Sequence, residues 1–154
     1  MSLTPKSREI IQYVTIRLAD QLLGLPVLQV QDVLKAQPVT RVPRAPGWVA
    51  GVLNLRGRIV TAIDLRGRLG LTPRSGGAHQ SMSIVVDRGK EPFAFLIDSV
   101  GEVLHLDRSE FEKNPVTLDP RWRQVSAGVF RLDSELLVIL DIDALINIEG
   151  LEAA

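Results

Sequence analysis

The chain of 154 residues contains no cysteine, which excludes disulfide bonds, thiolate catalysis and cysteine metal sites. It has only two histidines, His79 and His105, and their spacing does not fit a metal-binding pair. No apolar run approaches the roughly 20 residues that span a bilayer, and residues 1–10 lack the apolar core of a signal peptide. We therefore expect a soluble, cytoplasmic protein without a metal or cofactor.

Catalytic patterns are missing as well. No serine lies on a nucleophile elbow, and Gly67–Gly70 lacks the lysine of a phosphate-binding loop. Residues 75–77 are too short for a dinucleotide fingerprint. Asp141 and Asp143 could hold a cation weakly, but early-turn acids more often cap a helix. These absences predict a binding module and not an enzyme.

Charge is balanced overall but not along the chain. Residues 1–77 carry 11 basic and 4 acidic side chains, whereas residues 78–154 carry 7 and 14, so the halves differ in sign. Between Arg41 and Arg74 there are seven arginines and one acid, Asp64. This asymmetry could orient the protein against charged partners, or the two halves could simply attract each other. A nucleic-acid-binding surface formed by Arg41–Arg74 is a further alternative, although a net charge of zero and an aromatic content of 5% argue against it.

Residues 51–71 give the clearest structural pattern. They predict a strand, a two-residue turn, a returning strand apolar on both faces, and a short helix. In order, these are Val52–Arg56, the turn at Gly57 and Arg58, Ile59–Ile63, and a helical turn over Leu65–Leu69 that Asp64 caps and Gly70 ends. Asn54 and Arg56 share one face of the first strand. That face is either merely solvated or used for recognition.

The rest of the chain reads as short strands with frequent turns, as in an all-β protein with short helices. The expected strands are Gln12–Leu18, Leu22–Val27, Met82–Val86, Phe93–Ile97, Val100–Leu106, Val125–Leu132 and Glu135–Leu140. Leu28–Lys35 is interpreted as helical, with a short strand as the alternative, and Asp141–Ile148 as a final helix. Residues 42–50, 71–81 and 107–124 are expected to be loops.

An internal repeat organises these elements. Gly51–Leu69 aligns without gaps on Gly128–Ile146, and Val27–Leu34 aligns on Ile97–Leu104, at offsets of 77 and 70. The order hairpin, capping aspartate, short helix is kept in both copies, but Arg56-Gly57-Arg58 is replaced by Asp133-Ser134-Glu135. We expect two related β subdomains, about residues 15–80 and 81–150, with strand exchange possible at their ends, within a single domain over residues 1–154.

The run GVLNLRG at 51–57, followed by an apolar strand ending in Ile-Asp-Leu-Arg at 63–66, resembles the signature of CheW-type chemotaxis coupling proteins. The resemblance extends to Val30-Gln31-Asp32-Val33-Leu34, Asp98-Ser99-Val100 and Leu137–Asp141. Thr61 and Asp32 depart from it, standing where these proteins often have proline and glutamate. The resemblance implies two five-stranded SH3-like barrels packed across a shared apolar core.

The resemblance also implies a non-catalytic adaptor that links chemoreceptor cytoplasmic tips to the regulatory domain of a CheA-type histidine kinase. Contact with the membrane would be only indirect, through receptors, and pathways for swimming, twitching and surface sensing all remain open. The receptor-binding groove between the subdomains is expected to involve Val30, Asp32, Val33, Asn54, Arg56, Gly57, Val100 and Gly101. The kinase-docking loop is expected to comprise Val42, Pro43, Arg44, Pro46 and Trp48. A simple internal pair between Arg56 and Asp32 is the alternative to recognition.

Overall fold

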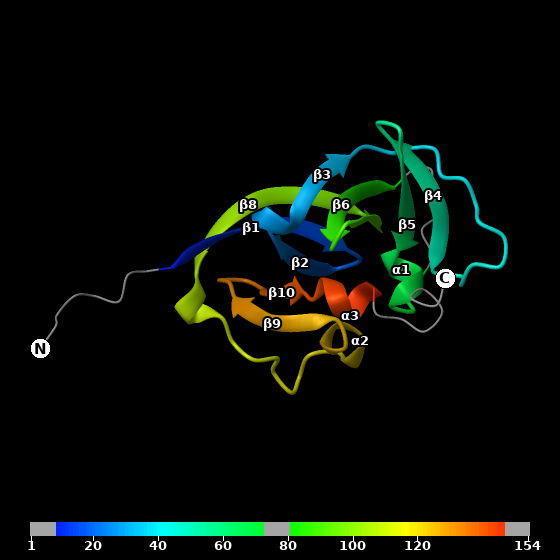
Figure 1. Ribbon diagram of the computed structural model, residues 1–154. Coiled ribbons are helices and arrows are strands. Elements are labelled where there is room, and N and C mark those ends of the chain that lie inside the picture. The colour runs from blue at the N-terminus through cyan, green and yellow to red at the C-terminus, as the bar shows by residue number, and fades with distance from the viewer. Residues whose placement is uncertain (1–8, 73–80, 147–154) are drawn as a thin grey trace, which may run out of the picture.

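The computed structural model describes residues 9–72 and 81–146, and the expected features at His79, Arg74, residues 75–77 and the end of the last helix lie outside them (Figure 1). Strands dominate these residues, with a few short helices between them. The strands are β1 Ile10–Leu18, β2 Gln21–Pro26, β3 Val30–Leu34, β4 Val49–Leu55, β5 Arg58–Asp64, β6 Met82–Arg88, β7 Glu91–Ile97, β8 Ser99–Asp107, β9 Ser126–Arg131 and β10 Leu136–Leu140. The helices are η1 Val27–Gln29, α1 Leu65–Arg68, η3 Arg108–Glu110, α2 Pro120–Arg123 and α3 Ile142–Ile146.

The strands form two five-stranded sheets with the same internal order. Sheet 1 runs β8-β1-β2-β10-β9 and sheet 2 runs β3-β6-β7-β5-β4. Each contains one parallel pairing at the same place, between β10 and β2 and between β5 and β7. In Figure 1 the strands of sheet 1 occupy the left of the view, and β3, β4, β5 and β6 lie to the upper right. The all-β fold class is therefore confirmed.

Strand register confirms that the two sheets are copies of one another. Val30 pairs with Val86 in sheet 2, and Val100 pairs with Ile16 in sheet 1, each residue being displaced by 70 positions from its counterpart. The parallel pairings correspond in the same way, with Ala62 opposite Ala94 and Ile139 opposite Gly24. Gly51–Leu69 and Gly128–Ile146 thus occupy matching topological positions, as the repeat predicts.

The chain passes from sheet 1 to sheet 2 after β2 and returns to sheet 1 after β7. Sheet 2 is built from residues 30–97, whereas sheet 1 combines residues 10–26 with residues 99–140. The expected boundary near residue 80 therefore falls inside sheet 2, between β5 and β6. The N-terminal hairpin β1–β2 joins the strands of the second half of the chain.

Three apolar clusters account for the burial pattern. The largest draws on both sheets and includes Ile16, Ile63, Phe95 and Leu140. Sheet 2 has a smaller cluster of its own around Leu53 and Val60, and sheet 1 has one around Phe130 and Leu137. Leu55 and Leu132, which are counterparts in the repeat, are only partly buried at the edges of the smaller clusters. Strands that contribute to two clusters are apolar on both faces, which explains their unbroken hydrophobic runs.

Three local predictions are wrong. Leu28–Lys35 is not a helix, because only Val27–Gln29 form a 3-10 turn and the chain then extends into β3, the alternative considered above. The β4–β5 turn is centred on Arg56 and Gly57, with φ of 52° and 87°, and not on Gly57 and Arg58. Ile59, expected to be covered, is 65% exposed beside this turn.

No helix within the described residues is long and apolar enough to cross a membrane. Within the same residues, no group of three or more His, Asp and Glu side chains is placed to hold a metal ion.

Candidate functional site

The tip of the β4–β5 hairpin has an unusual backbone. Both central residues have positive φ, as a tight turn between twisted strands requires, and arginine rarely occupies that region. Asn54 stabilises the turn, since its Oδ1 accepts a hydrogen bond of 2.8 Å from the amide of Gly57. Asn54 therefore has a local structural role, and the side chain held outward by the turn is that of Arg56.

Arg56 in the β4–β5 turn forms an ion pair with Asp32 on β3. Its Nη2 lies 2.9 Å from Asp32 Oδ2, and the two side chains are 78% and 22% exposed. The other oxygen of Asp32 accepts a 2.9 Å hydrogen bond from the amide of Val33, which fixes the carboxylate on β3. The pair expected as the alternative to recognition is therefore present. Because most of the guanidinium remains exposed, the pair orients Arg56 and leaves it able to contact a partner.

The apolar members of the predicted groove lie on two edge strands. Val30 is on β3 and Val100 is on β8, and both are half-buried against the core cluster that the two sheets share. Val33, also on β3, is 39% exposed. Val30 and Val100 thus both pack on the shared core cluster, and Arg56 pairs with Asp32.

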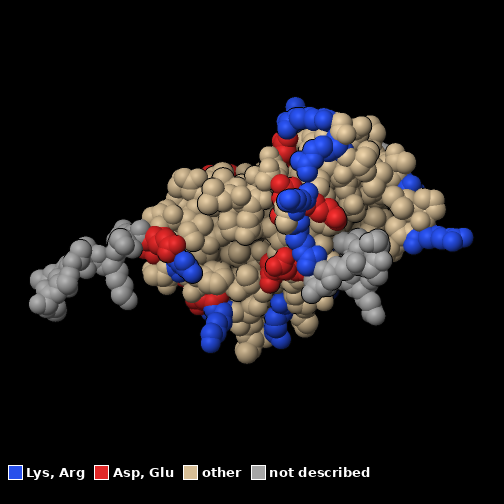
Figure 2. Space-filling model, in the orientation of Figure 1, with Lys and Arg blue, Asp and Glu red and all other residues tan. Residues whose placement is uncertain are grey.

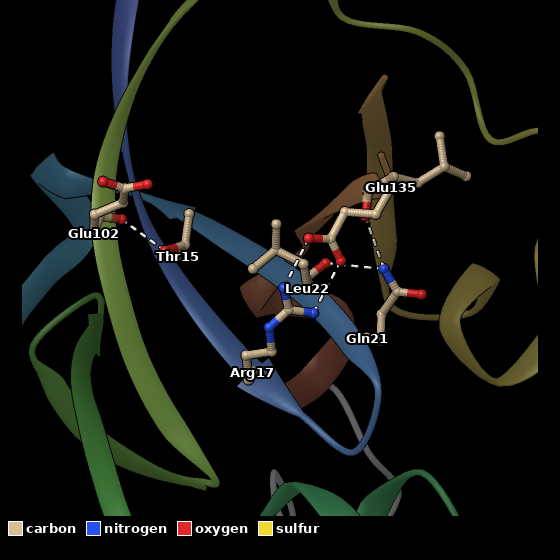
Figure 3. Close-up of polar contacts among 7 residues, drawn as sticks. Thr15, Arg17, Gln21, Leu22, Glu102 and Glu135 are labelled. Atoms are coloured by element: carbon tan, nitrogen blue, oxygen red, sulfur yellow. Dashed lines mark hydrogen bonds and ion pairs between the residues drawn. The ribbon is translucent and has the colours of Figure 1, made fainter. Parts of the chain in front are cut away.

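Gly101 lets β8 approach β1 closely. A Cβ at this position would lie 2.5 Å from Thr15 Oγ1, and that buried hydroxyl donates a 2.6 Å hydrogen bond to the carbonyl of Glu102 (Figure 3). A side chain at residue 101 would push the edge strand away from its neighbour. Gly101 therefore allows β8 to pack closely on β1.

The predicted kinase-docking loop is an ordered segment with an exposed tip. Val42 accepts from the amide of Ala45 and Pro46 from the amide of Val49, at 3.3 and 2.9 Å, so the chain turns twice. Val42, Pro43 and Arg44 are exposed, while Trp48 packs against the shared core and accepts a 2.8 Å hydrogen bond from the amide of Asp64 through its carbonyl. Trp48 therefore anchors the loop, and the exposed proline tip is the part that a partner could touch.

Among the ion pairs that the sequence did not predict, two join distant segments through bidentate contacts. Arg66 in α1 contacts Asp98 in this way. Arg17 in β1 does the same with Glu135, the residue before β10 (Figure 3). Arg66 and Asp98 lie within the Ile-Asp-Leu-Arg and Asp-Ser-Val motifs, which is the one signal that could have singled them out. Their pairing depends on the fold, since 32 residues separate them.

Charge is gathered at the junction of the sheets. Figure 2 shows a band of acidic and basic side chains running down this face over β3, β6 and α3, with a mostly uncharged surface to its left over β8 and β1. Several arginines of the Arg41–Arg74 stretch are engaged within the protein. Arg56 and Arg66 are ion-paired, and Arg68 donates to the carbonyl of Ala144.

Comparison with known proteins agrees with this architecture. The family model described as "CheW-like domain" matches residues 12–150. The chain belongs to the CheW-like domain family. A probable chemotaxis protein CheW from Rhizobium etli is 28% identical over 153 residues, covering 99% of this chain and 96% of that protein. A protein named PilI from Pseudomonas aeruginosa is 29% identical over 122 residues, covering 79% and 68%.

A solved structure resembles the whole fold. The scaffolding protein TtCheW from Thermoanaerobacter tengcongensis superposes with a TM-score of 0.81 at 29% identity, covering 92% of this chain and 96% of that one. The CheW-like assignment expected from the 51–66 motif is confirmed. The assignment of individual residues to receptor or kinase contacts stays a prediction.

Proposed function

We propose that this protein is a non-catalytic adaptor that couples the cytoplasmic tip of a chemoreceptor to the regulatory domain of a CheA-type histidine kinase. The observation that carries the proposal is the site at the junction of the sheets. It combines an outward-held arginine, an acid that orients it, and two half-buried valines on the edge strands β3 and β8. Membership of a scaffold family and its chemotaxis relatives support the same function.

The chemistry of the site fits a receptor helix. Val30 and Val100 can accept the apolar ridge of an amphipathic helix, while Arg56 can bond a carboxylate or the carbonyls at that helix's end. Arg56 suits this task better than lysine would because its planar fork makes paired hydrogen bonds. Adaptors need no chemistry beyond binding, so we expect no turnover.

The decisive variant is Arg56→Asp. Aspartate tolerates positive φ, and exposed ion pairs contribute only about 0–1 kcal/mol, so the melting temperature should barely change. Receptor-dependent activation of the kinase in a reconstituted assay should be lost. The matched control is Asp133→Arg, because Asp133 occupies the same position in the β9–β10 hairpin. That variant should couple normally. An Arg56→Asp protein that unfolds, or one that couples like the wild type, contradicts the receptor-binding assignment.

Kinase docking is tested separately. We place it on the exposed tip formed by Val42, Pro43 and Arg44, with Pro46 and Trp48 supporting the loop. Titration calorimetry with the isolated regulatory domain should give measurable heat, and Val42→Asp should weaken the binding without affecting receptor binding. An absence of heat at high micromolar protein would contradict kinase docking altogether.

The receptor and the kinase that the cell provides determine the chemosensory pathway in which the adaptor works. Relatives named CheW and PilI both match most of this chain, so we propose an adaptor of either a swimming or a non-swimming chemosensory system. Pull-down with each CheA-type kinase of the host would decide between them. The nucleic-acid alternative predicts a salt-dependent gel shift with mixed DNA or RNA, which we do not expect.

A further inference from the structure

The backbone passes between the sheets twice, at positions that the repeat makes equivalent. The first crossover is η1, which leads from β2 to β3, and the second is Asp98, which leads from β7 to β8. At the offset of 70 residues, Leu28 is the counterpart of Asp98. The hairpin turns beside them also correspond, with Ala19 at φ 55° and Gly89 at φ 64°.

At the second crossover one carboxylate bonds to both sheets. Asp98 Oδ2 accepts a 2.7 Å hydrogen bond from the amide of Ala19, in the β1–β2 turn of sheet 1. From the side of sheet 2, Arg66 Nε and Nη2 donate to the same carboxylate at 3.0 and 2.6 Å. The two side chains are only 18% and 22% exposed, and Arg66 also donates to the carbonyl of Thr72 at 2.7 Å. Charge-assisted, bidentate and partly buried contacts are the strong kind.

The first crossover has only a more exposed contact between the sheets. Leu28 is 95% exposed, and a cavity of about 470 Å³ lies between the ends of the strands here, lined among others by Gln29, Gly89 and Ile142. The counterpart of Arg66 is Asp143, which is 76% exposed and pairs with Arg88 at the end of β6 at 3.2 Å. The two equivalent crossovers therefore differ in how a carboxylate joins the sheets, which is partly buried and bidentate at Asp98 and largely exposed at Asp143.

We infer that Asp98 and Arg66 are positioning residues that set the orientation of sheet 2 against sheet 1, and with it the separation of the edge strands β3 and β8. Removing the contact at the second crossover leaves the sheets joined mainly by the apolar cluster, with the exposed Arg88–Asp143 pair and the 3.3 Å hydrogen bond from Arg68 to the carbonyl of Ala144 beside it. Dispersion and hydrophobic contacts are weakly directional, so the sheets can then settle in more than one relative orientation.

The absence of cysteine makes this measurable, since two introduced cysteines carry spin labels at chosen sites only. One pair, Gln31→Cys and His105→Cys, places labels on exposed positions of β3 and β8 and reports across the sheets. The other, Gln31→Cys and Lys90→Cys, stays within sheet 2. Pulsed electron paramagnetic resonance then gives the distance distribution for each pair. Asp98→Asn and Arg66→Gln, introduced separately, remove the charged contact.

Both substitutions should broaden or displace the distribution across the sheets and leave the one within sheet 2 unchanged. The matched control, Asp143→Asn at the equivalent crossover, should leave both distributions as they are. Folded Asp98→Asn and Arg66→Gln proteins with unaltered distances overturn the inference. So does equal broadening by Asp143→Asn, or loss of cooperative melting in both substituted proteins, since the pair would then maintain the fold itself.

A further consequence rests on the proposed function. If β3 and β8 form the receptor groove, Asp98→Asn should weaken receptor binding about fivefold while kinase binding stays constant. The label distances test the positioning role, whereas receptor binding tests the proposed function. If the distance distribution across the sheets shifts but neither the substituted nor the wild-type protein binds receptor, the proposed function is contradicted. The positioning role of Asp98 and Arg66 is then still supported.

Discussion

The β4–β5 and β9–β10 hairpins are the same element used twice, and they differ most at their tips. Arg56 and Gly57 form a turn with positive φ in the first, whereas Asp133 and Ser134 form the second without it. The charge is also inverted, because Arg56 corresponds to Asp133 and Arg58 to Glu135. Both tips nevertheless hold an ion pair, Arg56 with Asp32 in sheet 2 and Glu135 with Arg17 in sheet 1.

The pairs are not equivalent, and this difference bears on function. The residues of sheet 1 that correspond to Arg56 and Asp32 are Asp133 and Glu102, two acids that cannot attract each other. The fold therefore forms at this position without an ion pair and without an arginine in a strained conformation. Strained residues that the fold does not need are concentrated at functional sites. The comparison thus supports Arg56 as a recognition residue, and each prediction below tests how far the halves are alike.

The largest effect is expected in the shared core. Ile63 and Leu140 are counterparts, 0% and 3% exposed, and both belong to the cluster between the sheets. Each truncation to alanine should lower the free energy of unfolding by about 2–5 kcal/mol, the range for buried aliphatic side chains. Urea denaturation followed by circular dichroism measures this.

Ile59→Ala is the control within the same strand, because Ile59 is 65% exposed. It should change the stability by about 0.5 kcal/mol or less. A cost above 2 kcal/mol for one core position and near zero for its counterpart would show that the halves do not contribute equally to the shared core.

The second effect concerns two equivalent glycines within β4 and β9. Gly51 and Gly128 have φ of 148° and 157°, and a Cβ on either would collide with the segment bridged to that strand. At Gly51 the collision is with the carbonyl of Thr40, and at Gly128 with the ring of Phe111 and the carbonyl of Glu112. The isolated bridges Thr40–Val52 and Glu112–Val129 are thus repeated features, each requiring glycine.

Alanine at Gly51 or Gly128 should destabilise by about 1–3 kcal/mol from backbone strain, with the collision adding to it. Gly51→Ala should cost more, because its closest collision is with the backbone carbonyl of Thr40, whereas the closest collision at Gly128 is with the ring of Phe111, which can move more easily. Gly57→Ala isolates the strain, since nothing lies within 4 Å of its Cβ. Thermal melts rank the three variants. If Gly57→Ala proved the most damaging, the close approach of the bridged segments would not be what selects glycine.

The sequence predicted the fold correctly where both copies of the repeat have the same residue type at equivalent positions. Gly51 with Gly128 and Asp64 with Asp141 mark the start and end of each hairpin, so the repeat of this unit could be predicted. The correspondence between residues 12–28 and 82–98 was missed. Both segments alternate apolar and polar residues, but they have almost no identical residues in common. The helix expected at Leu28–Lys35 failed because β3 depends on pairing with β6, which lies about 50 residues later.

The site was predictable in part for the same reason. The motif identified Arg56, but Gly57 alone accounted for a tight turn, so the positive φ of Arg56 could not be foreseen. The contacts of Asp98 with Ala19 and Arg66 join three separate segments. No local pattern encodes such a contact, and only the sheet arrangement brings the groups together.

The smallest effect distinguishes the ion pairs at the hairpin tips by their pH dependence. Hydrogen bonds from Arg17, at 2.9 and 2.7 Å, lower the pKa of Glu135 below its ordinary value. A carboxyl whose pKa is lowered by folding stabilises the native state above its unfolded pKa of about 4.3, and this contribution disappears as the pH falls through the folded pKa. The side chains are 42% and 32% exposed, so solvent and salt screen the pair and the contribution is small.

Glu135→Gln should therefore melt slightly below the wild type at pH 7, and the difference should shrink as the pH falls below about 4.3 and disappear once the pH is below the lowered pKa of the folded state. Its counterpart Arg58→Gln provides the control, because arginine stays charged throughout this range and any difference should not follow this titration. Calorimetric melts from pH 3 to 7 at low salt give both curves. A gap for Glu135→Gln that is the same at pH 3 as at pH 7 would mean that the side chain acts through packing against Arg17 and Gln21 and not through its charge, and the two tips would then differ in shape alone.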